Sequence, residues 1–170
     1  MKTMTMTIKT RMAMIVGMLM TLMATATLNA QSAETFIDSG GSCSVFTVSH
    51  NGAAAPNWVC QAPITGGAVD DATSIGLSVV LNPDGSFTGG YISFYGQNGQ
   101  QMMAATNFSG TMASGTFTGS YSGMTPAGEA FTGDATQILA SRTVVNRYGR
   151  HTYYSVGAGS GGDVTFANND

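Results

Sequence analysis

The residues best suited to binding chemistry gather in one short segment, residues 142–154, with the sequence RTVVNRYGRHTYY. This segment holds three of the chain's four arginines, one of its two histidines and three tyrosines. The pair Tyr148-Gly149 predicts a turn, so we expect a hairpin whose tip carries Arg147, Tyr148, Arg150 and His151. Guanidinium groups beside aromatic rings suit carboxylate, sulfate and sugar surfaces. The tip is therefore a candidate site for an anionic or sugar ligand. The alternative is that its charges protect an edge strand from pairing with other sheets.

The rest of the sequence shows no residue spacing that is typical of catalysis or metal binding. A Gly-x-Ser-x-Gly sequence does not occur, and His50 and His151 are far apart in the chain. The acidic pair Asp70-Asp71 has no companions at metal-ligand spacing. The haem attachment sequence Cys-x-x-Cys-His is also missing, so haem could bind only without a covalent link. The sequence therefore predicts a protein that is not an enzyme and has no catalytic residue, metal or cofactor. Non-covalent haem binding and a secreted hydrolase are the alternatives.

The first 30 residues have the layout of a secretory signal peptide. Lys2, Lys9 and Arg11 precede an apolar run over residues 12–23, and small residues follow up to Ala30. The apolar run is shorter than the roughly 20 residues that a membrane-spanning helix needs. We therefore expect a signal peptide over residues 1–30 and one secreted domain over residues 31–170, with no transmembrane segment. The leader is typical of bacteria, which places the domain in the periplasm, at the cell surface or outside the cell.

The charge of the predicted mature domain argues against nucleic-acid binding. Residues 31–170 contain three arginines, no lysine and nine acidic residues, which gives a net charge of −6 with histidine neutral. Binding to a phosphate backbone needs clustered lysine and arginine. We therefore expect no nucleic-acid partner.

Cys43 and Cys60 are the only cysteines, and an even number in a secreted protein predicts a disulfide. They flank two apolar segments separated by Asn51-Gly52, a sequence typical of a tight hairpin turn. The sequence therefore predicts an N-terminal hairpin held by a Cys43–Cys60 disulfide.

Alternation of apolar and polar residues indicates an all-β domain. Residues 74–82 place Ile75, Leu77, Val79 and Leu81 on one face. Turn sequences follow at residues 82–85, 96–99, 113–115 and 125–128, and residues 157–162 are predicted to be a flexible joint. For residues 101–112 the pattern predicts that Met102, Ala104, Thr106, Phe108 and Met112 share a side. The expected fold is a meander of nine or so strands, either an antiparallel β-sandwich or a small β-barrel.

An aromatic residue, a hydroxyl residue and a glycine recur as a triplet between Phe87 and Gly133. In the stretch GTFTGSYSG, side chains that alternate along a strand place Phe117, Gly119, Tyr121 and Gly123 on one face. Thr116, Thr118, Ser120 and Ser122 occupy the other. Glycine beside an aromatic residue leaves room for a neighbouring ring over bare backbone. We therefore expect rings packed over glycines in the core, with hydroxyls facing water.

These triplets resemble the glycine-rich strands in the small β-barrel domains of transferrin-binding-protein-like surface proteins and secreted haemophores. The resemblance covers less than a third of the chain, and it implies a small barrel without assigning an iron or haem ligand to any residue.

Two functions from different classes agree with these patterns. The first is a non-catalytic extracellular or cell-surface protein that associates with itself, as a matrix or filament subunit does. The second is a barrel that holds a hydrophobic molecule or haem, lined by Phe87, Tyr91, Phe117, Tyr121 and Phe131.

Overall fold

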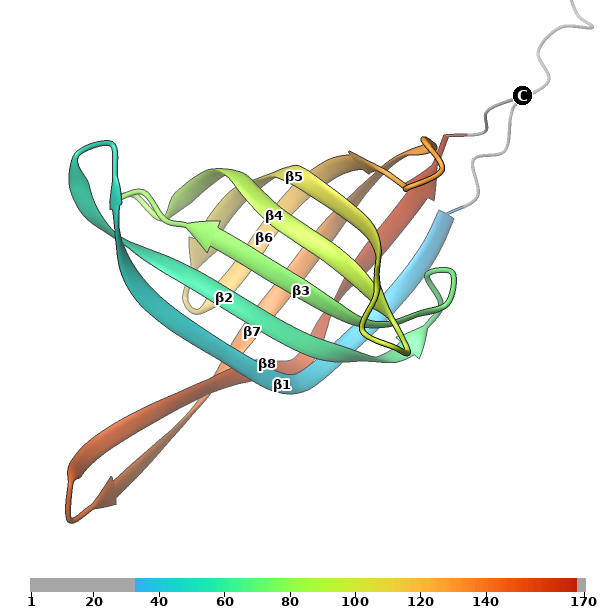
Figure 1. The fold of residues 1–170 in the computed structure, drawn as a ribbon. Coiled ribbons are helices and arrows are strands. Elements are labelled where there is room, and N and C mark those ends of the chain that lie inside the picture. The colour runs from blue at the N-terminus through green and yellow to red at the C-terminus, as the bar shows by residue number, and fades with distance from the viewer. Residues whose placement is uncertain (1–32, 168–170) are drawn as a thin grey trace, which may run out of the picture. The chain divides into compact units, whose positions relative to one another are not determined.

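The computed structural model describes residues 33–167, which form one closed antiparallel barrel of eight strands (Figure 1). Each strand pairs with the next, and the last pairs with the first. The strands are β1 (Ala33–His50), β2 (Ala53–Gly67), β3 (Ala72–Val80), β4 (Ser86–Gly96), β5 (Gln101–Ala113), β6 (Thr116–Met124), β7 (Ala130–Asn146) and β8 (Gly149–Phe166). The all-β meander is confirmed, and the barrel replaces the alternative of a sandwich. The meander has eight strands where we expected nine or so.

The predicted signal peptide, residues 1–30, lies outside the described residues. Residues 33–167 contain no helix of the length and apolar character that a membrane crossing requires.

The hairpin turns form where the sequence predicts them. Asn51 and Gly52 both adopt positive φ, 52° and 79°, and join β1 to β2 in two residues. Between β3 and β4, the Gly85 amide donates to the Asn82 carbonyl at 3.0 Å. The Asp84 carboxylate accepts the Ser86 amide at 2.9 Å and so stabilises the same turn.

The Cys43–Cys60 disulfide is formed and joins two directly opposed residues of β1 and β2. Both cysteines are buried in the core. Beside them, the Trp58 ring packs edge-on against Tyr154 of β8, with 5.0 Å between ring centroids. The predicted disulfide therefore fixes the first hairpin at the place where β1, β2 and β8 meet.

Aromatic rings inside the barrel lie over glycine backbone, as the triplets predict. A Cβ atom on Gly123 would lie 2.7 Å from Cζ of Phe131, and one on Gly119 would lie 2.9 Å from Cε2 of Phe108. Both distances are too short for a real contact. The same Cβ atoms would also overlap the carbonyl oxygens of Ala104 and Ser109 in β5, so glycine here admits both the ring and the neighbouring strand.

The rings pack against each other through the whole interior. Phe87 and Phe108 approach to 4.9 Å between centroids, and Phe36 and Phe94 to 5.4 Å. Phe87, Phe117 and Phe131 each expose 1% or less of their surface. Because a water-sized space beside a ring would leave some of its surface accessible, these rings are enclosed by protein atoms on all sides.

A β-bulge in β4 reverses the alternation that the sequence predicts for Tyr91. Gly89 has a φ of +67°, and the pairing with β5 shifts between Phe87 and Gly90. The extra residue moves the next side chains to the opposite face. Tyr91 therefore lies on the outer face, where its hydroxyl donates to Oε1 of Gln101 at 2.9 Å. The prediction that Tyr91 lines the barrel is wrong.

A second irregularity corrects the predicted face of β5. The pairing of β5 with β6 shifts between Ala105 and Ser109. Before this shift Met103 and Ala105 are buried, and after it Phe108 is buried. The assignment of Met102, Ala104 and Thr106 to the face of Phe108 is therefore wrong. One extra residue in β5 reverses which of its alternating side chains face the core.

The end of the chain differs from the prediction. Residues 157–162 lie within one strand, β8, which runs from Gly149 to Phe166, but its pairing with β1 and β7 shifts across residues 157–160, where Gly159 has a φ of +90°. Gly162 pairs with both Phe36 of β1 and Ala135 of β7. The glycines of this segment therefore belong to the wall of the barrel.

Replacing Gly123 by Ala tests whether this position of the core requires bare backbone. The new methyl group would overlap the Phe131 ring and the Ala104 carbonyl oxygen of β5, so we expect the free energy of unfolding to fall by about 1–3 kcal/mol. Gly66→Ala is the matched control, because its Cβ would lie 3.4 Å from Cδ1 of Ile37, an ordinary contact. Urea denaturation measures both variants. Equal stability of the two would contradict this account of the core.

Candidate functional site

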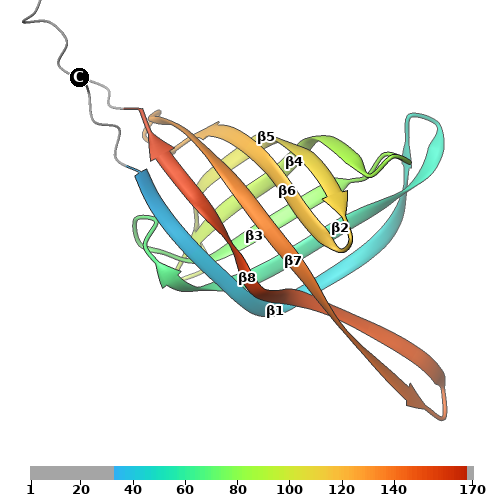
Figure 2. The same ribbon diagram turned by 180° about the vertical axis from the view of Figure 1, so that it is seen from behind.

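Two hairpins continue beyond the closed part of the barrel at one end (Figures 1 and 2). These hairpins project because the strands differ in length: β1, β2, β7 and β8 contain 15 to 18 residues, whereas β3 and β6 contain 9. β1 and β8 pair as far as Cys43 opposite Tyr154 and then separate. We call residues 44–56 the β1–β2 arm and residues 142–153 the β7–β8 arm.

The β7–β8 arm is a two-stranded ribbon with a two-residue turn. Its paired residues run from Arg142 opposite Tyr153 to Asn146 opposite Gly149. The Tyr148 amide donates to Oδ1 of Asn146 at 2.9 Å, which stabilises the turn. Because β6 ends its pairing with β7 at Ile138, no other strand within residues 33–167 flanks the arm on either side.

The four residues predicted for the tip do not form one pocket. Arg147 and Tyr148 make up the turn, with the guanidinium 4.6 Å above the tyrosine ring. Arg150 is paired with Val145, and His151 is paired with Val144. Since adjacent residues of a strand face opposite sides, Arg150 and His151 lie on opposite faces of the ribbon. The positive charge therefore surrounds the arm and does not converge on one ligand position.

The β1–β2 arm presents an unpaired strand edge that the sequence analysis missed. Residues 44–50 of β1, with the sequence SVFTVSH, pair with β2 and have no partner on the β8 side in the part of the chain that the structure describes. This edge contains no charged residue, glycine or proline. Its Phe46 side chain is 55% exposed. An uncharged β-forming segment of this kind is the available sequence signal for such an edge.

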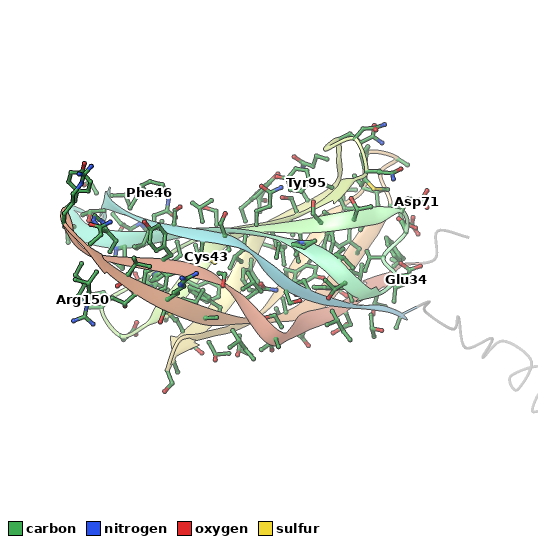
Figure 3. All side chains as sticks on the ribbon, turned by 90° about the horizontal axis from the view of Figure 1, so that it is seen from below. Glu34, Cys43, Phe46, Asp71, Tyr95 and Arg150 are labelled. Carbon is green, nitrogen blue, oxygen red and sulfur yellow. A yellow bond between two sulfur atoms is a disulfide. The ribbon has the colours of Figure 1, made fainter. Side chains whose placement is uncertain are left out.

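Cationic and acidic side chains lie in different parts of the molecule. Figure 3 shows Arg150 and Phe46 at the end with the arms, and Glu34 and Asp71 at the opposite end. The three arginines of the domain all lie on the β7–β8 arm. At the opposite end, a carboxylate oxygen of Glu34 accepts the amide of Asp70 at 2.9 Å. Each molecule therefore has a cationic β7–β8 arm and a barrel that carries the acidic residues.

The other residues predicted to line a ligand cavity do meet inside the barrel. Phe87, Phe117, Tyr121 and Phe131 belong to the packed core. The Tyr121 hydroxyl donates to the Asp163 carbonyl at 2.7 Å. Burial raises the pKa of Tyr121, and the nearby Asp163 and Asp134 carboxylates add to that rise. A ligand in the barrel would have to separate rings that now pack against one another.

A polar groove of about 490 Å³ crosses the outer face of β5 to β8. It is lined by hydroxyl side chains together with the carboxylates of Asp134 and Asp163. Oδ1 of Asn107 accepts the Ser122 amide at 2.9 Å where β5 bulges away from β6. Within residues 33–167, no group of three or more His, Cys, Asp and Glu side chains is placed to hold a metal ion.

Asp38 is a carboxyl group buried inside the barrel. Its Oδ1 accepts a hydrogen bond from Nε2 of Gln137 at 3.0 Å, and its Oδ2 has no partner among the described residues. Burial raises the pKa of Asp38 from 3.8 to about 6, and the hydrogen bond from Gln137 opposes this rise. The folded barrel therefore favours the protonated acid.

This pKa shift predicts a barrel that is more stable in mild acid. Because the folded pKa exceeds the unfolded one, the stabilisation is complete below pH 4 and is lost as the pH rises through about 6. We expect the free energy of unfolding to fall by about 2–3 kcal/mol between pH 4 and pH 7. Urea denaturation over this range measures it.

Asp38→Asn should remove most of this pH dependence. Asp84→Asn is the control, because hydrogen bonds from the side chain and backbone of Ser86 lower the pKa of Asp84 and move its titration below this range. A variant with Asn at position 38 that keeps the full slope between pH 4 and pH 7 would contradict the assignment to Asp38.

Comparisons of the chain with protein-family models, with curated proteins and with solved structures found no match. The resemblance to transferrin-binding-protein-like barrels therefore stays a prediction.

Proposed function

We propose that this protein is a secreted, non-catalytic structural subunit that associates with copies of itself through the strand edges of its two arms. The observation that carries the proposal is the unpaired, uncharged edge at residues 44–50 of β1.

An open strand edge is a template for pairing with another chain, because its amides and carbonyls have no partner in the sheet. Proteins that remain monomeric commonly block such an edge with lysine, proline, a bulge or a covering loop. Residues 44–50 contain neither lysine nor proline, and their pairing with β2 is regular from Ser42 to His50. Exposed Val45 and Phe46 add apolar surface that a second strand would cover.

The predicted compartment agrees with this role. A disulfide persists in an oxidising environment, and the predicted leader directs the chain out of the cytoplasm. The outer wall of the barrel carries hydroxyl side chains such as Thr116, Thr118 and Ser120. These hydroxyl groups keep the outer wall of the barrel hydrated. The exposed apolar side chains of the arms are then the surface suited to self-association.

Thr47→Lys tests the role of the β1 edge. Lysine on an edge strand opposes pairing, so we expect the dissociation constant for self-association to rise by about tenfold, which corresponds to 1.4 kcal/mol. Sedimentation equilibrium of residues 31–170 over a range of concentrations measures it.

Thr118→Lys is the matched control for this measurement. Thr118 is exposed like Thr47, but β6 is paired on both sides, with Thr111 and Thr136 as its partners. The control should associate as the wild type does. A wild-type protein that stays monomeric at millimolar concentration, or an equal loss in both variants, would refute the proposed function.

A further inference from the structure

We infer that copies of this protein join head to tail, with the β1 edge of one copy paired to the β7–β8 arm of the next. This inference rests on the proposed self-association and specifies which surfaces meet. The partner is a second copy of this chain.

The pairing register is already set inside the barrel. β1 and β8 are antiparallel neighbours up to Cys43 opposite Tyr154, and beyond that pair each strand continues without the other. An extension of the same register would place residues 44–48 opposite residues 149–153. Val45 would face Thr152, and Thr47 would face Arg150. The separation of the arms prevents these pairs within one copy, so they remain available to a second copy.

The charges oppose pairing between two β7–β8 arms. Each arm carries Arg142, Arg147 and Arg150 and no acidic residue. Two such ribbons side by side would bring six guanidinium groups together, and like charges across paired strands are destabilising. The β1 edge carries no charge, so a cationic arm that pairs with it meets no like charge across the two strands.

Exposed apolar surface distinguishes head-to-tail pairing from pairing between two β1 edges. On the β7–β8 arm, Val145 is 75% exposed, Tyr148 is 73% exposed and Tyr153 is 60% exposed. A dimer formed by two β1 edges would leave these side chains in water. Head-to-tail pairing places the arm that carries them against the neighbouring copy.

The consequence is an open chain of subunits. A contact between two different surfaces leaves one unused edge at each end of every assembly, and further copies can add there unless the rotation closes a ring. Pairing between identical surfaces would stop at a dimer.

Two variants with one blocked edge each test this inference. Thr47→Lys blocks the β1 edge and leaves the arm intact, whereas Thr152→Lys blocks the arm and leaves the β1 edge intact. Both sites are exposed and lie outside the closed part of the barrel. Circular dichroism and the unfolding midpoint check that each variant folds, and Tyr153→Lys serves as a second arm variant.

Sedimentation velocity separates the outcomes. At a concentration between the dissociation constants of the wild type and of the variants, head-to-tail pairing predicts a series of oligomers for the wild type, monomers for each variant alone, and a heterodimer but nothing larger for the equimolar mixture. A dimer of Thr152→Lys alone would show β1-to-β1 pairing, and a dimer of Thr47→Lys alone would show arm-to-arm pairing. Either result overturns the inference while the proposed self-association stands. A monomeric wild type refutes both.

The register has a test of its own at position 47. Thr47→Glu would face Arg150 of the neighbouring copy, and an opposite-charge pair across strands should lower the dissociation constant by about two- to fivefold. The net negative charge of the domain predicts the contrary sign, because an added carboxylate increases general repulsion. Weaker association of Thr47→Glu would therefore overturn this register.

Discussion

The barrel depends on aromatic rings that pack over bare glycine backbone. Phe131 occupies the space beside Gly123, and Phe108 occupies the space beside Gly119, at positions where a methyl group would overlap the ring. A small closed barrel has an interior only wide enough for side chains. Alternation of large side chains and glycine along β6 lets rings from neighbouring strands pack into that interior. It also sends every second residue outward, where threonine and serine meet water.

The arms follow from the same closure. Strands of 9 residues set the height of the closed wall at β3 and β6, and strands of 15 to 18 residues on the other side must project beyond it. The pairing of β1 shifts on both sides between Asp38 and Cys43, where Gly40 and Gly41 adopt positive φ. These irregularities come immediately before β1 and β8 separate. The bend in β1 therefore directs the two arms apart and leaves their facing edges unpaired.

Charge then gives the two arms different properties. Acidic groups lie on the outer wall and at the end opposite the arms, with Asp84 in the β3–β4 turn beside the β1–β2 turn, whereas the arginines all lie on the β7–β8 arm. The like charges of two arms disfavour pairing between arms, whereas the neutral β1 edge adds no repulsion when it meets an arm. Asp38 is the exception to this surface placement, because the barrel buries it with one hydrogen bond from Gln137 and so makes the fold sensitive to pH.

The sequence alone determined the local features of this protein. Alternation placed Ile75, Leu77 and Val79 inside, Asn51-Gly52 made the first turn, and the only two cysteines could form only one disulfide. These features depend on neighbours along the chain. The tertiary structure decided what depends on distant strands: the closure of β1 onto β8, the bulge that turns Tyr91 outward, and the burial of Asp38 against Gln137. It also decided which edges stay open, because a strand is an edge only in relation to where its neighbours end.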